Sequence, residues 1–77
     1  MSKLPLVEAK ELEQILFYLG FLRKRQKGSH VFYKHQDGRY TTLPYHSGRV
    51  ISRPLLRQIL HQIRITPKEY IKLLNKL

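Results

Sequence analysis

Two turn signals divide the middle of the chain into three short segments with strand character, and this pattern limits the possible folds more than any other. Gly28-Ser29 separates residues 22–27 from residues 30–35, and Asp37-Gly38 separates the latter from residues 40–43. Asp-Gly is a strong hairpin signal because both central positions of the favoured two-residue turn need a positive φ. The sequence therefore predicts a three-stranded antiparallel meander.

Segments with helical periodicity lie on both sides of this meander. Apolar residues three and four positions apart predict a helix over residues 7–19, closed by Gly20. The same spacing predicts a second helix that begins near Pro54, and a capping-box pattern at residues 66–69 starts a short C-terminal helix. The apolar residues of the two longer patterns are Leu12, Ile15, Leu16 and Leu19, and Leu55, Leu56, Ile59, Leu60 and Ile63.

The resulting order is helix, three strands, helix and short helix. It predicts an α+β fold in which helices cover one face of an antiparallel sheet and leave the other free. Double-stranded-RNA-binding domains have a similar layout of a helix, three strands and a helix. A chain of 77 residues supports one domain, residues 1–77, and its 42% hydrophobic content argues against disorder.

A two-residue turn at Asp37-Gly38 would also fix the pairing of the second and third strands. The predicted partners are His35 with Tyr40, Phe32 with Leu43, and His30 with Tyr45. This register places His30 and His46 at the same end of the sheet. Which face is buried stays open, because residues 30, 32 and 34 and residues 31, 33 and 35 both mix apolar and polar side chains.

The charge of the chain favours nucleic acid as its partner. The formal net charge is +10, and residues 23–64 contain ten lysines and arginines but a single acid, Asp37. A field of that sign attracts phosphate backbones and steers their approach. The alternatives are a charge that only keeps the protein soluble, or a basic face that meets an acidic protein.

Composition excludes several other classes. The chain has no cysteine, so disulfide scaffolds, Cys-based zinc sites and thiol catalysis are excluded. The longest apolar run, residues 15–19, is too short for a membrane span, and acids interrupt the place of a secretory leader. We expect a soluble cytoplasmic protein with no membrane association.

Two of the four histidines lie where a phosphate can be bound. His30 follows the Gly28-Ser29 turn, whose backbone N–H groups can face an anion, and His46 lies in a loop before a predicted helix N-terminus. Acting as base and acid, two histidines at one phosphate would divide the work of cleaving RNA without a metal. The spacing equally permits surface residues with no special role, which is our interpretation of His35 and His61.

Four further residues complete the predicted site. They would bind RNA through a positive charge or through a small hydroxyl that leaves room for a phosphate, and the cations would stabilise negative charge on the phosphoryl oxygens. These residues are Lys27, Ser29, Arg39 and Arg49.

We expect no metal and no cofactor. No H-x-H or H-E-x-x-H spacing occurs, and Asp37 is the only carboxylate in the central part of the chain. Nucleotide-binding glycine motifs are absent as well. Aromatic side chains at positions 32, 33, 40 and 45 would either stack on unpaired bases or pack within the sheet, and we favour packing for Phe32 and one tyrosine.

Five short motifs together resemble the HicA family of toxin ribonucleases, from the first predicted helix to about residue 70. The motifs are Gly20-Phe21, Lys27-Gly28-Ser29-His30, Asp37-Gly38-Arg39, Pro44-Tyr45-His46-Ser47-Gly48 and Leu56-Arg57-Gln58-Ile59-Leu60. The resemblance implies a double-stranded-RNA-binding-like fold, endonucleolytic cleavage of mRNA that arrests translation and growth, and neutralisation by a HicB-type antitoxin. It assigns the catalytic histidine to His30 and a second histidine motif to His46.

Two other functions are compatible with the sequence. The first is a non-catalytic module that uses the same fold to hold RNA. The second is a helix-turn-helix DNA reader formed by the helices that begin near Pro54 and Pro67. The second is less favoured, because the last helix carries only Lys68, Lys72 and Lys76 as basic residues and lacks a base-reading stripe.

Overall fold

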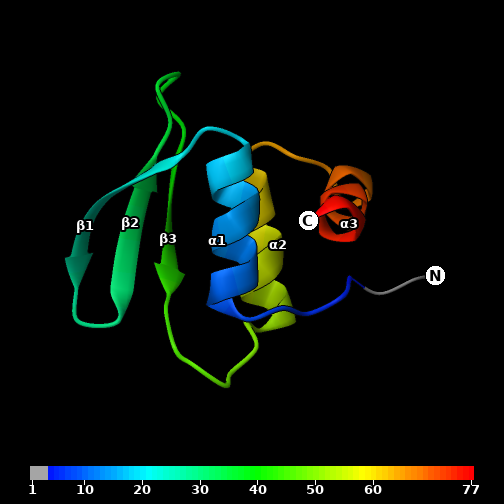
Figure 1. The fold of residues 1–77 in the computed structure, drawn as a ribbon, viewed down its shortest axis with the longest axis horizontal. Coiled ribbons are helices and arrows are strands. Elements are labelled where there is room, and N and C mark those ends of the chain that lie inside the picture. The colour runs from blue at the N-terminus through cyan, green and yellow to red at the C-terminus, as the bar shows by residue number, and fades with distance from the viewer. Residues whose placement is uncertain (1–3) are drawn as a thin grey trace.

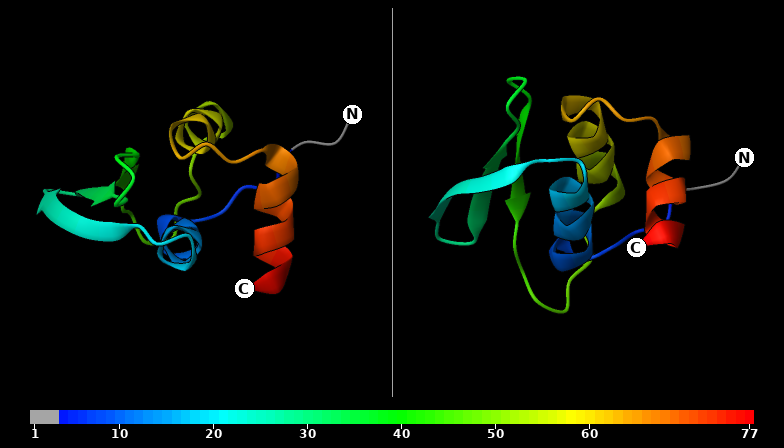
Figure 2. Two further views of the ribbon diagram at one scale, coloured as in Figure 1. Left: turned by 90° about the horizontal axis from the view of Figure 1, so that it is seen from above. Right: turned by 45° about the horizontal axis from the view of Figure 1, so that its top comes forward.

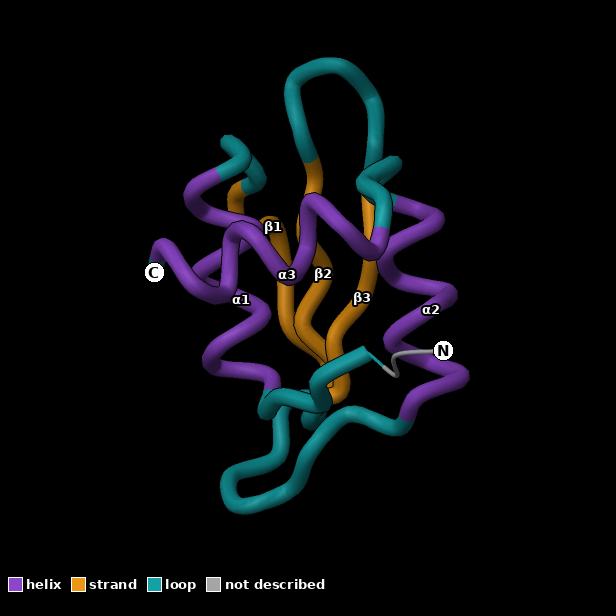
Figure 3. Tube along the Cα trace, turned by 90° about the vertical axis from the view of Figure 1, so that its right-hand side faces the viewer, coloured by secondary structure: helices purple, strands orange, loops and turns teal. Residues whose placement is uncertain are grey.

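The computed structural model describes residues 4–77 and has the expected α+β architecture. A three-stranded antiparallel sheet in the order β1-β2-β3 packs on one side against α1 and α2, as in double-stranded-RNA-binding domains (Figure 1). The third helix lies across α1 and α2 on their side away from the sheet (Figures 2 and 3). The elements are α1 (Ala9–Tyr18), β1 (Leu22–Lys27), β2 (His30–Lys34), β3 (Tyr40–Pro44), α2 (Arg53–Gln62) and α3 (Pro67–Lys76).

The predicted register of β2 and β3 is wrong by one residue. His30 pairs with Pro44, Phe32 with Thr42, and Lys34 with Tyr40. The cause is the loop, which has three residues instead of two. The backbone N–H of His35 donates to the carbonyl of Arg39 at 2.8 Å, and the N–H of Gly38 donates back to His35 at 3.0 Å. Three-residue loops with glycine in the last position are the next common hairpin after the two-residue type.

The corrected register decides which side chains of β3 face the helices. A shift of one residue exchanges the two faces of a strand. Thr41 and Leu43 are buried together with Val31 and Tyr33, whereas Thr42 is exposed on the same side as His30. The open face of the sheet therefore belongs to the even-numbered residues of β2 and β3.

The first helix is shorter than predicted at its N-terminus. It begins at Ala9 with Glu8 as N-cap, in a capping box with Glu11. The preceding residue, Val7, is held by the chain that enters α2, because the N–H of Ile51 donates to the Val7 carbonyl at 2.8 Å. This contact between distant segments competes with helix formation at Val7, and local periodicity does not encode it.

The first two helices end in the same hydrogen-bond pattern but with different residues. After α1, the N–H of Gly20 donates to Phe17 and that of Phe21 to Leu16, as predicted for a left-handed helix end. After α2, the matching donors are Arg64 and Ile65. Both turning residues have a positive φ, +98° for Gly20 and +59° for Arg64. The left-handed conformation costs a residue with a Cβ about 1 kcal/mol.

One buried carboxylate connects α1 to the sheet. Glu13 is 6% exposed, accepts a hydrogen bond from Arg23 of β1 at 2.5 Å, and also accepts one from the hydroxyl of Tyr33 in β2. The hydroxyl of Tyr45, just after β3, lies 3.5 Å from its other oxygen. Burial would raise the pKa of Glu13, but the hydrogen bonds from Arg23 and Tyr33 and the charge of Arg23 outweigh it and hold this pKa below its usual value of 4.5.

We predict that Glu13→Gln destabilises the fold by about 1.5 to 3 kcal/mol at neutral pH, because the buried partners lose a charged acceptor. A lowered native pKa adds stability above the unfolded-state pKa, and this stability disappears as the pH falls through the native pKa. The free energy of unfolding of the wild type should therefore fall below about pH 4.5, and less steeply in the variant. Asp37 and Glu69 also have lowered pKa values and supply the residual slope. Urea unfolding across this range measures both slopes; equal slopes would contradict the role of Glu13.

Candidate functional site

The open face of the sheet carries a hollow that is lined in part by His30. The hollow has a volume of about 460 Å³ and is lined by Arg25, Lys27, His30, Phe32 and Thr42. All five lie on one face because Arg25 pairs with Phe32 and Lys27 with His30, while β3 places Thr42 opposite Phe32. The helices cover the other face, so this hollow is accessible to a large ligand (Figure 2).

The position of His30 depends on the tight turn before it. Lys27 and His30 are paired, so Gly28 and Ser29 form a two-residue loop. Gly28 has φ +58°, and Ser29 has no positive φ, which is the pattern of a type II′ turn with glycine first. The turn presents Lys27 and His30 side by side on the open face.

A second hollow runs between β3 and α2 and also includes His30. We call it the β3–α2 groove; its volume is about 350 Å³. It is lined by His30, Tyr40, Thr41, Thr42, Pro44, Leu55, Gln58 and Gln62. Because His30 and Thr42 line both hollows, the exposed imidazole of His30 lies where the open face meets the groove. A polymer lying in the groove passes this imidazole.

His46 and Arg49 lie in the loop that follows β3, at the same end of the sheet as His30 (Figure 1). The loop is fastened there because the N–H of Tyr45 donates to the Ser29 carbonyl at 2.7 Å, and the N–H of Gly48 donates to Glu8 at 3.1 Å. The side chains of His46 and Arg49 are exposed, and neither lines the two hollows around His30. The expectation of a shared end is met, while a joint action of the two histidines stays a prediction.

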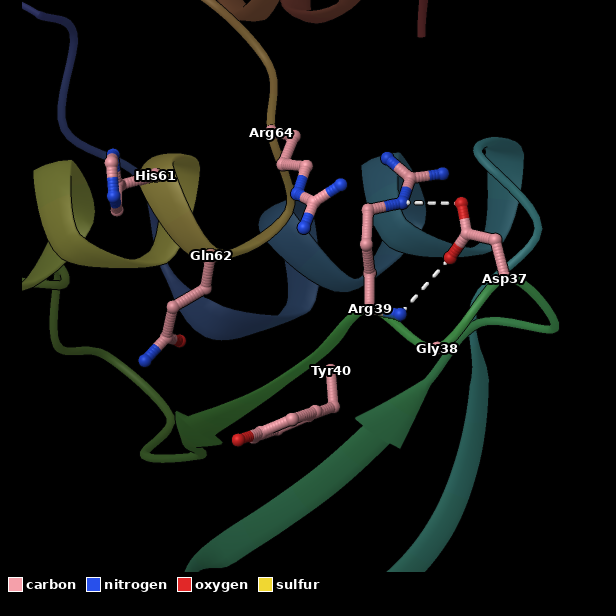
Figure 4. A pocket seen from close by; sticks show the side chains of 7 residues that line it. All are labelled: Asp37, Gly38, Arg39, Tyr40, His61, Gln62 and Arg64. Atoms are coloured by element: carbon pink, nitrogen blue, oxygen red, sulfur yellow. Dashed lines mark hydrogen bonds and ion pairs between the residues drawn. The ribbon is translucent and has the colours of Figure 1, made fainter.

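Arg39 lies at the opposite end of β3. Its guanidinium group donates to Asp37 at 2.7 Å (Figure 4). It also donates to the Ile63 carbonyl at 2.6 Å and lies over the ring of Phe21. These contacts hold the β2–β3 loop against the end of α2. Of the four predicted RNA-binding residues, the structure places Lys27 and Ser29 beside His30, Arg49 in the adjoining loop, and Arg39 away from them.

The other two histidines differ in their surroundings. His35 accepts a hydrogen bond from the Asp37 N–H at Nδ1, and its Nε2 lies 3.1 Å from the Leu19 carbonyl, so it connects the β2–β3 loop to the end of α1. His61 is exposed near the end of α2. His35 therefore has a structural role at this contact, while the absence of a chemical role for His35 and His61 stays a prediction.

Sequence reasoning missed several residues beside His30. Arg25 and Thr42 share its hollow, and Gln58 extends the groove from α2. Arg25 could have been found by the alternation from Lys27. Thr42 could not, because the predicted register paired Phe32 with Leu43 and so placed Leu43, not Thr42, on the same face as His30.

Within residues 4–77, no group of three or more histidine, aspartate or glutamate side chains could hold a metal ion. Over the same residues, no helix has the length and apolar character needed to cross a bilayer.

Fold and site together define a class: small basic α+β proteins of the double-stranded-RNA-binding type, with an exposed histidine between an open sheet face and a groove. Residues 9–65 match the family model described as the HicA toxin of bacterial toxin–antitoxin systems. The chain therefore belongs to the HicA toxin family, as the sequence motifs indicated. Membership makes it the toxin of such a pair and implies an antitoxin as its partner. No curated protein matches the chain at a significant level.

We predict that Gly28→Ala destabilises the protein by about 1 kcal/mol, because a Cβ at positive φ is strained. No atom lies within 4 Å of the added Cβ, so strain is the only cost. Ser29→Ala is the matched control and should change the free energy of unfolding by less than about 0.5 kcal/mol. Urea unfolding of both variants tests this, and equal stabilities would rule out the type II′ turn.

Proposed function

We propose that this protein is a metal-independent endoribonuclease that cleaves mRNA in the cytoplasm, with residues 1–77 acting as one toxin domain. The observation that carries the proposal is the position of His30, exposed between two cations and the β3–α2 groove. Membership in a family of bacterial toxins supports a growth-inhibiting activity. The net charge of +10 supports a polyanionic substrate.

Cleavage would proceed by attack of the RNA 2′-oxygen on the neighbouring phosphorus. A base removes the 2′-OH proton while the bond between the 2′-oxygen and phosphorus forms, and the bond to the 5′-oxygen breaks. An acid returns a proton to the leaving 5′-oxygen. The products are a 2′,3′-cyclic phosphate and a 5′-hydroxyl. His30 takes one of these roles, and His46, in the loop at the same end of the sheet, is our candidate for the other.

The cationic side chains would bind the substrate and stabilise negative charge on the phosphoryl oxygens. Lys27 shares the hollow with His30, so it is the nearest candidate for the scissile phosphate. Arg49 lies exposed in the loop with His46 and would bind a neighbouring phosphate. Ser29 leaves room for the backbone at the turn. Arg39 would contribute only indirectly at the far end of the strand, because its guanidinium group is held by Asp37 and the Ile63 carbonyl.

We further propose that a HicB-type antitoxin inhibits the toxin by covering the open face and blocking His30. This face has a hollow beside His30 that is lined by two cations, Arg25 and Lys27. A protein that binds there would exclude RNA and neutralise charge at once. An antitoxin that binds only the folded toxin would also stabilise this small domain by mass action.

We predict that the wild type cleaves a defined single-stranded RNA in the presence of EDTA, and that His30→Ala and His30→Gln lower the rate at least about 100-fold. His30 is exposed, so both variants should keep the thermal unfolding midpoint of the wild type. Analysis of the RNA ends should find 2′,3′-cyclic or 3′-phosphates. Binding without cleavage by the wild type would leave a non-catalytic RNA-binding module, and cleavage by both variants would remove His30 from the mechanism.

In a bacterial host, induced expression of the wild type should arrest growth, whereas His30→Gln expressed to the same level should not. The physical reason is that the variant keeps the fold and the charge of the surface but cannot transfer a proton at this position. Colony counts and immunoblots after induction give the comparison. Equal arrest by both proteins would assign toxicity to binding alone.

A further inference from the structure

A third hollow lies at the far end of the β3–α2 groove, and we call it the hairpin pocket. Its volume is about 420 Å³. It is lined by Asp37, Gly38, Arg39, Tyr40, His61, Gln62 and Arg64 (Figure 4). Tyr40 and Gln62 also line the groove that contains His30, so the two hollows adjoin. A strand of nucleic acid that leaves His30 along β3 reaches the hairpin pocket.

The hairpin pocket favours an anion. The carboxylate of Asp37 is neutralised by Arg39, which donates to it from Nε at 2.7 Å and from the backbone N–H at 3.0 Å. Arg39 itself is occupied by this pair and by the Ile63 carbonyl. The guanidinium group of Arg64 makes no hydrogen bond or ion pair with any of residues 4–77 and is directed toward the pocket (Figure 4). Arg64 is therefore the cation available to a ligand.

The backbone at Arg64 gives a second and independent indication. Arg64 occupies the left-handed position that ends α2, with φ +59°, where α1 has Gly20. Glycine suits this conformation better than any residue with a Cβ. The arginine thus contributes through its side chain and not through the turn. Strain retained at the rim of a pocket is typical of binding sites.

Tyr40 and Gln62 supply groups that recognise a base. The Tyr40 side chain is 58% exposed, and its ring is tilted against Phe32 with the centroids 5.8 Å apart, which fixes its position. An exposed aromatic ring of this kind stacks on an unpaired base. Gln62 accepts a hydrogen bond from the Thr41 hydroxyl through Oε1 at 2.6 Å, which leaves its amide N–H groups to donate to a base edge.

We propose that the hairpin pocket is a nucleotide-binding subsite for single-stranded RNA. One base stacks on Tyr40 beside Gln62, and an adjacent phosphate binds Arg64. The subsite lies about 13 Å along β3 from His30, as four residues of strand separate Tyr40 from Pro44, the partner of His30. It rests on the proposed function, since RNA is its ligand, and it selects the substrate by contacts remote from the bond that is cleaved.

The test measures binding of a single-stranded RNA of about ten nucleotides to proteins that carry His30→Ala, so that no cleavage interferes. Arg64→Gly removes the cation and also relieves the backbone strain. It should raise the thermal unfolding midpoint, yet weaken RNA binding about threefold or more and lower the salt dependence by about one phosphate contact. Tyr40→Ala should weaken binding roughly fivefold or more with an unchanged salt dependence.

Arg57→Ala is the matched control. It removes the same charge from α2, the helix that Arg64 follows, but Arg57 does not line the hairpin pocket. Arg57 lines another hollow with Leu4, Ile65 and Pro67, which shares only His61 with the hairpin pocket. Its effect on RNA binding should be smaller than that of Arg64→Gly. Equal effects of the two arginine variants, or an unchanged affinity in Tyr40→Ala, would overturn the subsite.

Different outcomes of these experiments would refute the subsite and the proposed ribonuclease activity. If the protein with His30 intact does not cleave RNA but Arg64→Gly and Tyr40→Ala still weaken binding as expected, the subsite is supported and the ribonuclease activity is refuted. If the wild type cleaves RNA and these variants bind it as the control does, the activity is supported and the subsite is refuted. Absence of any RNA binding refutes both.

Discussion

A buried carboxylate, Glu13, connects α1 to the sheet beside the apolar core that the helices and the sheet share. From α1, Glu13 accepts hydrogen bonds from Arg23 of β1 and Tyr33 of β2, and its other oxygen lies 3.5 Å from the hydroxyl of Tyr45, just after β3. An unpaired carboxylate in this position would oppose folding, so the strands have to bring their donors to it. Tyr33 belongs to the buried face of β2, and His30 belongs to its open face. The contacts of Glu13 thus attach α1 to the face of the sheet opposite the candidate site.

Local chemistry accounts for most of the fold. The apolar spacing, the glycine-containing turns and the capping box at Thr66 were sufficient to predict every element and the antiparallel order. The two errors have one kind of cause. The β2–β3 loop has one residue more than predicted, because the backbone of His35 pairs with that of Arg39. Val7 lies outside the helix in which it was predicted, because its carbonyl accepts from Ile51. Both contacts depend on backbone groups, whose pairing the identity of the side chains specifies weakly.

The site was predictable in part. His30 and Lys27 came from the turn and from the family motif, and the structure places them together on the open face. Arg25 and Gln58 were not found, because their nearness to His30 depends on strand register and helix packing. Arg39 was grouped with His30 on charge alone, although its guanidinium group is used within the fold at the other end of the strand. Charge density in a sequence predicts a basic protein more readily than it predicts which cations are available.

The loop between β3 and α2 is anchored mainly by its own main chain. The N–H groups of Tyr45, Gly48 and Ile51 bond to the Ser29 carbonyl, the Glu8 carboxylate and the Val7 carbonyl, respectively. Any amino acid except proline can supply such a donor. Exposed positions of this loop, such as His46 and Arg49, are thus free to diverge during evolution without loosening the fold. The charge and shape of the surface beside His30 can therefore change through substitutions in this loop while the backbone around that histidine stays in place.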